Sequence, residues 1–323
     1  MEMPLILSLG LSALLGTSAV NPCLDPTDAD YSCELDVDGA IFFGECGLTD
    51  EDVDDLTSCL DVTGREDIVE IWMRGNALTT LPAGIFEGLT NLTFLGFDEN
   101  ALTTLPEAIF DGLTGLTLLR LGENNLTTLP EGVFEGLTNL EGLLLNDNAL
   151  TTLPAGIFEG LTKVDNLRLW SNGLTTLPAE IFESLTNLAS LSLFYNVLTT
   201  LPEGIFDGLM RLERLSLQYN ALRTLPEGIF EGLTSLETLY INNNSLECLP
   251  TVPSSVTVLD VDTYGDECGE RLSEGGRMNL ENMVGASNGI ELLSSVSAQV
   301  PERVCTLAES LKHPVMNSKQ SRD

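Results

Sequence analysis

The fold of this protein is decided by the stretch LTLLRLGENNLTTLPEGVFEGLTN, residues 116–139, because close variants of it recur along the chain. Its asparagine Asn124 belongs to a series that is spaced every 24 residues, at 76, 100, 124, 148, 172, 196, 220 and 244. A constant period of this size indicates a solenoid, in which each unit forms one coil and the coils stack.

The first half of each unit predicts a short strand. In residues 116–139, Leu119 and Leu121 alternate with variable residues, which is typical of a strand with one buried face. A single strand of this length cannot bury its apolar side alone, so we expect successive strands to pair in a parallel sheet. Places in a unit are counted here from residue 116 as place one, so Asn124 is at place nine. This asparagine follows the strand, and its side chain is expected to satisfy backbone groups of adjacent coils.

The second half of each unit, LTTLPEGVFEGLT in this example, is rich in Gly and Pro and predicts turns and short 3₁₀ pieces on the outer side. A phenylalanine recurs there every 24 residues, and these rings are expected to stack as a spine. The spine residues are Phe86, Phe110, Phe134, Phe158, Phe182, Phe206 and Phe230.

The pattern resembles the leucine-rich repeat family in its extracellular 24-residue form, as found in variable lymphocyte receptors and in Toll-like receptor, Slit and Nogo-receptor ectodomains. The resemblance covers residues 68–260. It implies an α/β solenoid shaped as a horseshoe, with a parallel β-sheet on the concave side, a mostly irregular or 3₁₀ convex side, and disulfide caps. It also implies binding of proteins or glycans on the concave sheet.

The chain divides into five predicted regions. Residues 1–19 indicate a signal peptide, because a short apolar run, residues 4–15, precedes the small residues 16–19; a buried N-terminal helix is the alternative. A cysteine-containing cap is expected over 20–67, eight repeats over 68–247, and a truncated repeat with a C-terminal cap over 248–269. Residues 270–323 show no period and predict a poorly ordered tail.

The cysteines lie only at the two ends of the chain. In an exported protein this distribution favours disulfides in the caps, and we expect Cys248 to pair with Cys268. The pairing of the four N-terminal cysteines stays open: Cys23, Cys33, Cys46 and Cys59. An odd total of seven leaves Cys305 as a free or intermolecular thiol.

Composition excludes several classes of function. The chain has 49 acidic and 14 basic residues, a formal charge of −35, which argues against nucleic acid and anionic membrane surfaces as partners. A single histidine rules out paired-histidine metal sites, and the position of His313 near the C-terminus, outside the repeats, argues against a Ser-His-Asp relay. No later segment is long and apolar enough for membrane insertion. We therefore expect no enzyme activity, no cofactor and no metal site.

Candidate binding residues follow from the outward-facing strand places, which change from unit to unit while the outer half stays nearly constant. These places hold aromatic and arginine side chains, the types that dominate interface energetics. The alternative is sequence drift at unconstrained positions. The predicted ligand-binding residues are Trp72, Arg120, Arg168, Trp170, Phe194, Tyr195, Arg214, Tyr219 and Tyr240.

These features predict a secreted, extracellular recognition module for a protein or glycan; the alternative is a structural or adhesive extracellular protein. Three sequons, at Asn91, Asn125 and Asn243, are candidate glycosylation sites.

Overall fold

The computed structural model describes residues 39–62 and 64–262, all within one compact unit. The signal-peptide region 1–19, the tail 270–323 and four of the cysteines lie outside the described residues: Cys23, Cys33, Cys268 and Cys305. The predictions made for them remain predictions. In the described part, no helix is long and apolar enough to cross a bilayer.

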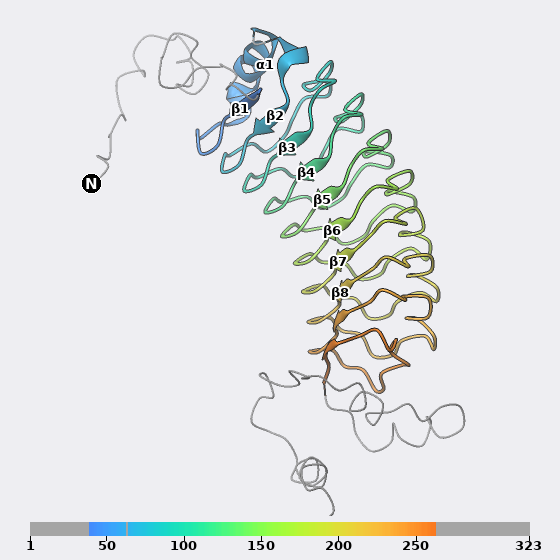
Figure 1. The fold of residues 1–323 in the computed structure, drawn as a ribbon. Helices are drawn as coiled ribbons and strands as arrows, with labels where there is room; N and C mark the ends of the chain where they lie inside the picture. The colour runs from blue at the N-terminus through green and yellow to red at the C-terminus, as the bar shows by residue number, and fades with distance from the viewer. Residues whose placement is uncertain (1–38, 63, 263–323) are drawn as a thin grey trace, which may run out of the picture. The chain divides into compact units, whose positions relative to one another are not determined.

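One parallel sheet of ten strands, in chain order, runs along the inner side of a curved stack of coils (Figure 1). The strands are three residues long: β1 Ala40–Phe42, β2 Glu70–Trp72, β3 Phe94–Gly96, β4 Leu118–Arg120, β5 Gly142–Leu144, β6 Asn166–Arg168, β7 Ser190–Ser192, β8 Arg214–Ser216, β9 Thr238–Tyr240 and β10 Val258–Asp260. The predicted parallel solenoid is confirmed.

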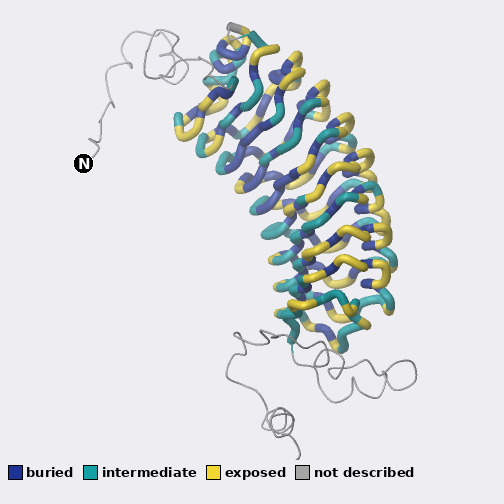
Figure 2. The backbone as a smooth tube through the Cα atoms, viewed as in Figure 1, coloured by how far each residue is buried: buried dark blue, intermediate teal, exposed yellow. Residues whose placement is uncertain are grey.

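The register follows the repeat. Leu119 on β4 pairs with Leu143 on β5 and, 24 residues further on, with Leu167 on β6, so equivalent residues stand side by side. Their side chains are fully buried, and the dark blue stretches that recur from coil to coil in Figure 2 mark the backbone of such buried residues. No single coil could bury these leucines by itself, which is why the coils form only as a stack.

The predicted phenylalanine spine forms on the outer side of this core. From Phe110 to Phe230 each ring stacks on the next, with centroids 6.2–6.5 Å apart and ring planes within 8–12°. The first member, Phe86, packs instead against Phe97 at 5.5 Å. All of these rings are buried.

The place-nine asparagines connect consecutive coils, as predicted. Asn124 accepts the backbone N–H of Leu102 in the preceding coil through Oδ1, at 3.0 Å. Its Nδ2 donates to the carbonyl of Phe97 at 2.9 Å and to that of Leu121, in its own coil, at 3.3 Å. Equivalent bonds recur at the other seven asparagines, so a ladder of buried and partly buried amide groups runs the length of the repeats.

The outer halves of the coils are turns, and the expected 3₁₀ helices do not occur in them. Hydrogen bonds of the i to i+3 type are present, as from the N–H of Glu135 to the carbonyl of Gly132, but only alternate N–H groups make them. A 3₁₀ helix needs consecutive bonds. Glycines with positive φ, such as Gly132 at 76° and Gly136 at 83°, interrupt most of these turns. The coil with Glu180 and Ser184 has the same alternate bonds without such glycines.

The N-terminal cap contains a strand that the sequence analysis did not predict. Strand β1 pairs with β2, so the sheet starts one coil earlier than the first repeat. Its Ile41 and Phe43 take the buried places, and Cys46 stands where the repeats have asparagine. The 3₁₀ turn η3 (Asp50–Asp52), helix α1 (Val53–Val62) and 3₁₀ turn η4 (Arg65–Asp67) complete the cap.

Candidate ligand-binding face

The inner surface of the sheet is the candidate site, and the strand geometry decides which side chains reach it. Side chains alternate along a strand, so places four and six enter the core while places three, five and seven point out of the concave face. Place eight follows each strand and lies at one edge of this face. Because the strands are in register, each place forms a row that crosses all the repeats.

Four of the predicted binding residues form one continuous group of rings in these rows, here called the aromatic ladder. Trp170 stacks on Phe194 with centroids 5.1 Å apart and planes 6° apart. Phe194 meets Tyr195 edge to face at 5.6 Å, and Tyr195 stacks on Tyr219 at 4.4 Å. Tyr240 lies on the next strand, β9, and makes no ring contact within the described residues, so it stands apart from the ladder.

The two tyrosines of the ladder occupy a backbone conformation that bulky residues seldom adopt. Place eight has positive φ throughout the repeats, and Tyr195 and Tyr219 have φ of 52° and 56°. Glycine, asparagine or aspartate would relieve the strain at such a position. Their side chains are nevertheless 52% and 41% exposed, so burial does not explain them. The same positive φ occurs in every repeat, also at Glu99 and Glu123, so it belongs to the coil and is not specific to the two tyrosines.

A second aromatic stack lies at the N-terminal end of the face. The ring of Trp72 stacks on Phe94 at 3.9 Å and on Phe42 at 6.1 Å. Trp72 was a predicted binding residue, whereas Phe42 was not, because it belongs to the unpredicted strand β1. Phe42 is 61% exposed at the end of this stack.

The four arginines of the concave face fall into two classes. Arg74 is paired with Glu99, and Nε of Arg120 lies 2.8 Å from Oδ2 of the buried Asp98. Arg168 and Arg214 are exposed and have no ion pair with any described residue. The predicted site residue Arg120 is therefore held by an internal partner, while the arginines beside the aromatic ladder are free to meet a ligand.

The comparisons with known proteins identify the family. The family model for the leucine rich repeat matches residues 70–126, 114–169, 162–222 and 210–252, which together cover the repeats continuously. The chain is a leucine-rich repeat protein. A search of curated protein sequences found no match.

Solved structures of other leucine-rich repeat proteins are similar to this one. A leucine-rich repeat protein from Leptospira interrogans is 31% identical with a TM-score of 0.56; the match covers 68% of this chain and 54% of that one. Toll-like receptor 13 in complex with the single-stranded RNA ssRNA13 is 25% identical with a TM-score of 0.56; the match covers 67% and 38%. This leucine-rich repeat protein thus spans about half of the first protein's length and less of the second's.

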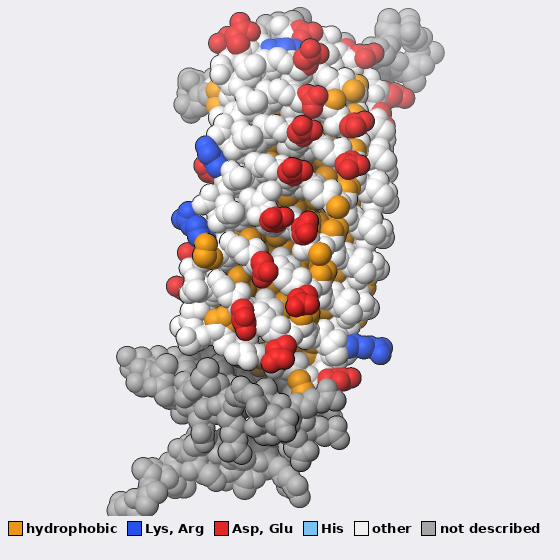
Figure 3. All heavy atoms as spheres, turned by 90° about the vertical axis from the view of Figure 1, so that its right-hand side faces the viewer, with side chains coloured by type: hydrophobic (Ala, Val, Ile, Leu, Met, Phe, Trp, Pro, Cys, Tyr) orange, Lys and Arg blue, Asp and Glu red, His pale blue; other side chains and the backbone are white. Residues whose placement is uncertain are grey.

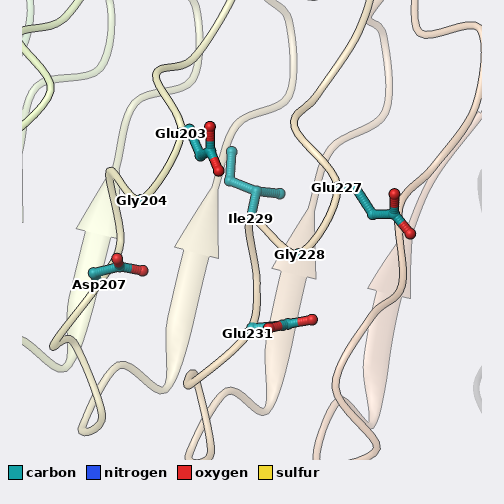
Figure 4. A pocket seen from close by; sticks show the side chains of 7 residues that line it. All are labelled: Glu203, Gly204, Asp207, Glu227, Gly228, Ile229 and Glu231. Atoms are coloured by element: carbon teal, nitrogen blue, oxygen red, sulfur yellow. The ribbon is translucent and has the colours of Figure 1, made fainter.

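The outer face of the leucine-rich repeat stack differs strongly from the concave face. Figure 3 shows Asp and Glu side chains along its whole length, between apolar patches. Shallow grooves between its turns are lined by carboxylates, among them Glu203, Asp207, Glu227 and Glu231, which are spread around the groove in Figure 4. No group of side chains in the described part of the chain is arranged to hold a metal ion.

Acidic residues also gather in the middle of the concave face, next to the paired arginines. Burial raises the pKa of Asp98, and the Arg120 guanidinium opposes the rise. The hydrogen bond from Arg74 lowers the pKa of Glu99. Partial burial, followed by the charges of Glu99 and Asp147, raises the pKa of Glu123. Like charges that stand in one row across neighbouring strands destabilise the fold.

Replacing Glu123 by glutamine should therefore stabilise the protein at neutral pH. A carboxyl group whose pKa is raised by folding costs stability at pH values above that pKa, and the cost disappears as the pH falls through it. We expect a higher melting temperature for Glu123→Gln at pH 7 and no difference from the parent below the ordinary pKa of glutamate. Thermal unfolding at both pH values measures this. Glu180→Gln is the control, because Glu180 is exposed on an outer turn. The equivalent places of the adjacent coils hold Gly156 and Gly204, which carry no charge to repel it.

Proposed function

We propose that this leucine-rich repeat protein is a secreted, non-catalytic recognition module that binds a protein or glycan ligand on its concave face. The observation that carries the proposal is the aromatic ladder of Trp170, Phe194, Tyr195 and Tyr219. Tryptophan and tyrosine supply large contact area at a low entropic cost, and they are enriched where binding energy concentrates.

Secretion is supported by the apolar run at residues 4–15 and by the cysteines. All seven cysteines lie outside the repeats, a distribution that suits disulfides formed in an oxidising compartment. We propose that Cys248 pairs with Cys268 and that Cys305 is the thiol left over.

Of the three glycosylation sequons, we propose Asn125 and Asn243 as the used ones. Both are exposed, and their side-chain amides make no hydrogen bond to any described residue. The amide of Asn91, in contrast, donates to the carbonyl of Glu66 at 2.7 Å. A glycan on Asn243, at place eight of the ninth strand's coil, would restrict access to that end of the face.

The neighbouring structure of Toll-like receptor 13 contains an RNA, but we do not propose RNA for this chain. Its formal charge is −35, and each phosphate brought to the surface adds to the repulsion. A ligand with little or no net negative charge, or with one localised charge, fits the concave face better.

The proposal is tested by the double substitution Trp170→Ala, Phe194→Ala. We expect the parent protein to capture one or a few extracellular or cell-surface components and the double variant to lose them. Truncation of interface aromatics of this kind typically weakens binding by 2 kcal/mol or more each, which is about thirtyfold. Capture from cell-surface extracts, followed by mass spectrometry, measures the difference.

The matched control is Val197→Ala, Met210→Ala, since both side chains are exposed and lie outside the strands. Circular dichroism must show that all three proteins are equally folded. Equal capture by all three would refute the concave-face proposal. Recovery of further copies of the protein alone would favour the second candidate, a structural or adhesive protein, which the acidic outer face supports.

A further inference from the structure

We propose that the concave face of repeats five to eight binds a saccharide that carries a single carboxylate, held between Arg168 and Arg214. This inference rests on the proposed function and names the ligand class for the same face. It arises from three features that the proposed function does not use. These are two arginines without an ion pair, a floor of serine hydroxyl groups, and strands that are hydrogen-bonded to a neighbouring strand on both sides.

The floor consists of Ser190, Ser192 and Ser216 and lies beside the aromatic ladder. In the place-five row, Arg168 is followed by Ser192, Ser216 and Tyr240 on the next three strands. In the place-three row, Ser190 lies next to Arg214. The three serines leave a low strip across β7 and β8, and none of their hydroxyl groups bonds to another described residue. A ligand rich in hydroxyl groups finds unengaged donors and acceptors here.

The floor has an arginine at each side. Arg168 lies on β6 and Arg214 on β8, so their strands are on the order of 10 Å apart. One sugar ring with its substituents fits this interval. Both guanidinium groups are exposed and lack an internal acid, unlike Arg74 and Arg120. A guanidinium fork pairs well with a carboxylate, through two parallel hydrogen bonds.

The total charge of the protein limits how acidic the ligand can be. With a formal charge of −35, the chain repels polyanions over long distances. A single carboxylate at the end of an otherwise neutral saccharide experiences little of this repulsion and gains the local attraction of both arginines. The exposed rings of Tyr195 and Tyr219 supply an apolar wall for the C–H face of the sugar.

An acidic peptide fits less well, for a reason of topology. Peptides that bind sheets gain affinity by pairing their main chain with an unpaired strand edge. Strands β6 to β9 are interior, and each is paired on both sides. The site therefore offers side-chain groups alone, and these match the hydroxyl and carboxylate groups of a saccharide.

The test compares sialyllactose with lactose, which lacks the carboxylated sugar, by isothermal titration calorimetry against the full-length secreted protein. We expect binding of sialyllactose and at least about tenfold weaker binding of lactose. Arg168→Gln and Arg214→Gln should each weaken sialyllactose binding by at least about tenfold and leave lactose binding unchanged. The control Arg223→Gln makes the same change in net charge at an exposed residue outside the strands, and should have no effect.

Three results would overturn this inference. The first is equal affinity for the two sugars, which would show that the carboxylate is not recognised. The second is an effect of Arg223→Gln as large as that of the site variants. The third is binding of an acidic peptide or a heparin fragment, dependent on the arginines, without binding of sialyllactose. If none of the probes binds, but Trp170→Ala, Phe194→Ala still abolishes capture of a surface protein, the saccharide is refuted and the recognition function stands.

Discussion

Replacing Phe158 by alanine is expected to destabilise the protein by about 3–5 kcal/mol. Its ring is buried and stacks between Phe134 at 6.5 Å and Phe182 at 6.3 Å, so its removal leaves a cavity in the middle of the spine. In a solenoid, stability depends on contacts between neighbouring repeats. The substitution removes one side chain from two such interfaces, and we expect the two halves of the stack to unfold less cooperatively.

Urea unfolding, monitored by circular dichroism, measures the effect. Met210→Ala serves as the control, because Met210 is 63% exposed and lies outside the spine, and its replacement should change stability by no more than about 0.5 kcal/mol. A loss below about 1 kcal/mol for Phe158→Ala would show that the spine does not couple the coils.

The second large effect is expected for Asn124→Leu, which keeps the size of the side chain and removes its polar atoms. The backbone N–H of Leu102 would lose its acceptor, and the carbonyls of Phe97 and Leu121 would lose a donor. Each buried polar group left without a partner costs about 1–3 kcal/mol, so we expect a total loss of about 2–5 kcal/mol. Chemical unfolding again gives the value.

The neighbouring residue supplies a matched control. Asn125 is exposed, and its side chain bonds to no described residue, so Asn125→Leu should be nearly neutral in an unglycosylated preparation. If the two leucine variants were equally stable, the asparagine ladder would not be a structural element of the stack, and its periodicity would need another explanation.

The regular part of the fold could be predicted from the sequence because every coil repeats the same pattern of buried and exposed residues. The 24-residue period fixes the register, and the alternation around Leu119 separates the buried from the outward-facing side chains. Strand β1 could not be found in this way. Its residues pair with β2 at an offset of 30, so Ile41 and Phe43 fall outside the period, and Phe42 was missed as a member of the N-terminal aromatic stack.

The sequence predicted which residues lie on the concave face, but it did not predict which of their side chains contact one another. The row positions predicted which residues share the concave face, including Trp170, Phe194 and Tyr195. They did not show that Arg120 is held by Asp98, because an ion pair between adjacent rows depends on side-chain rotamers. The positive φ at place eight was also not predicted, although Gly75 and Asn243 at that place are residue types that tolerate it.

Hydroxyl-radical footprinting of the protein, with and without its captured ligand, shows whether the concave face is the surface that binds. We expect the ligand to protect Trp170, Tyr195 and Tyr219 from oxidation and to leave Met210, outside the strands, as reactive as in the free protein. Protection of Met210 with unchanged reactivity of the two tyrosines would refute binding at the concave face, because the ligand would then occupy the outer turns.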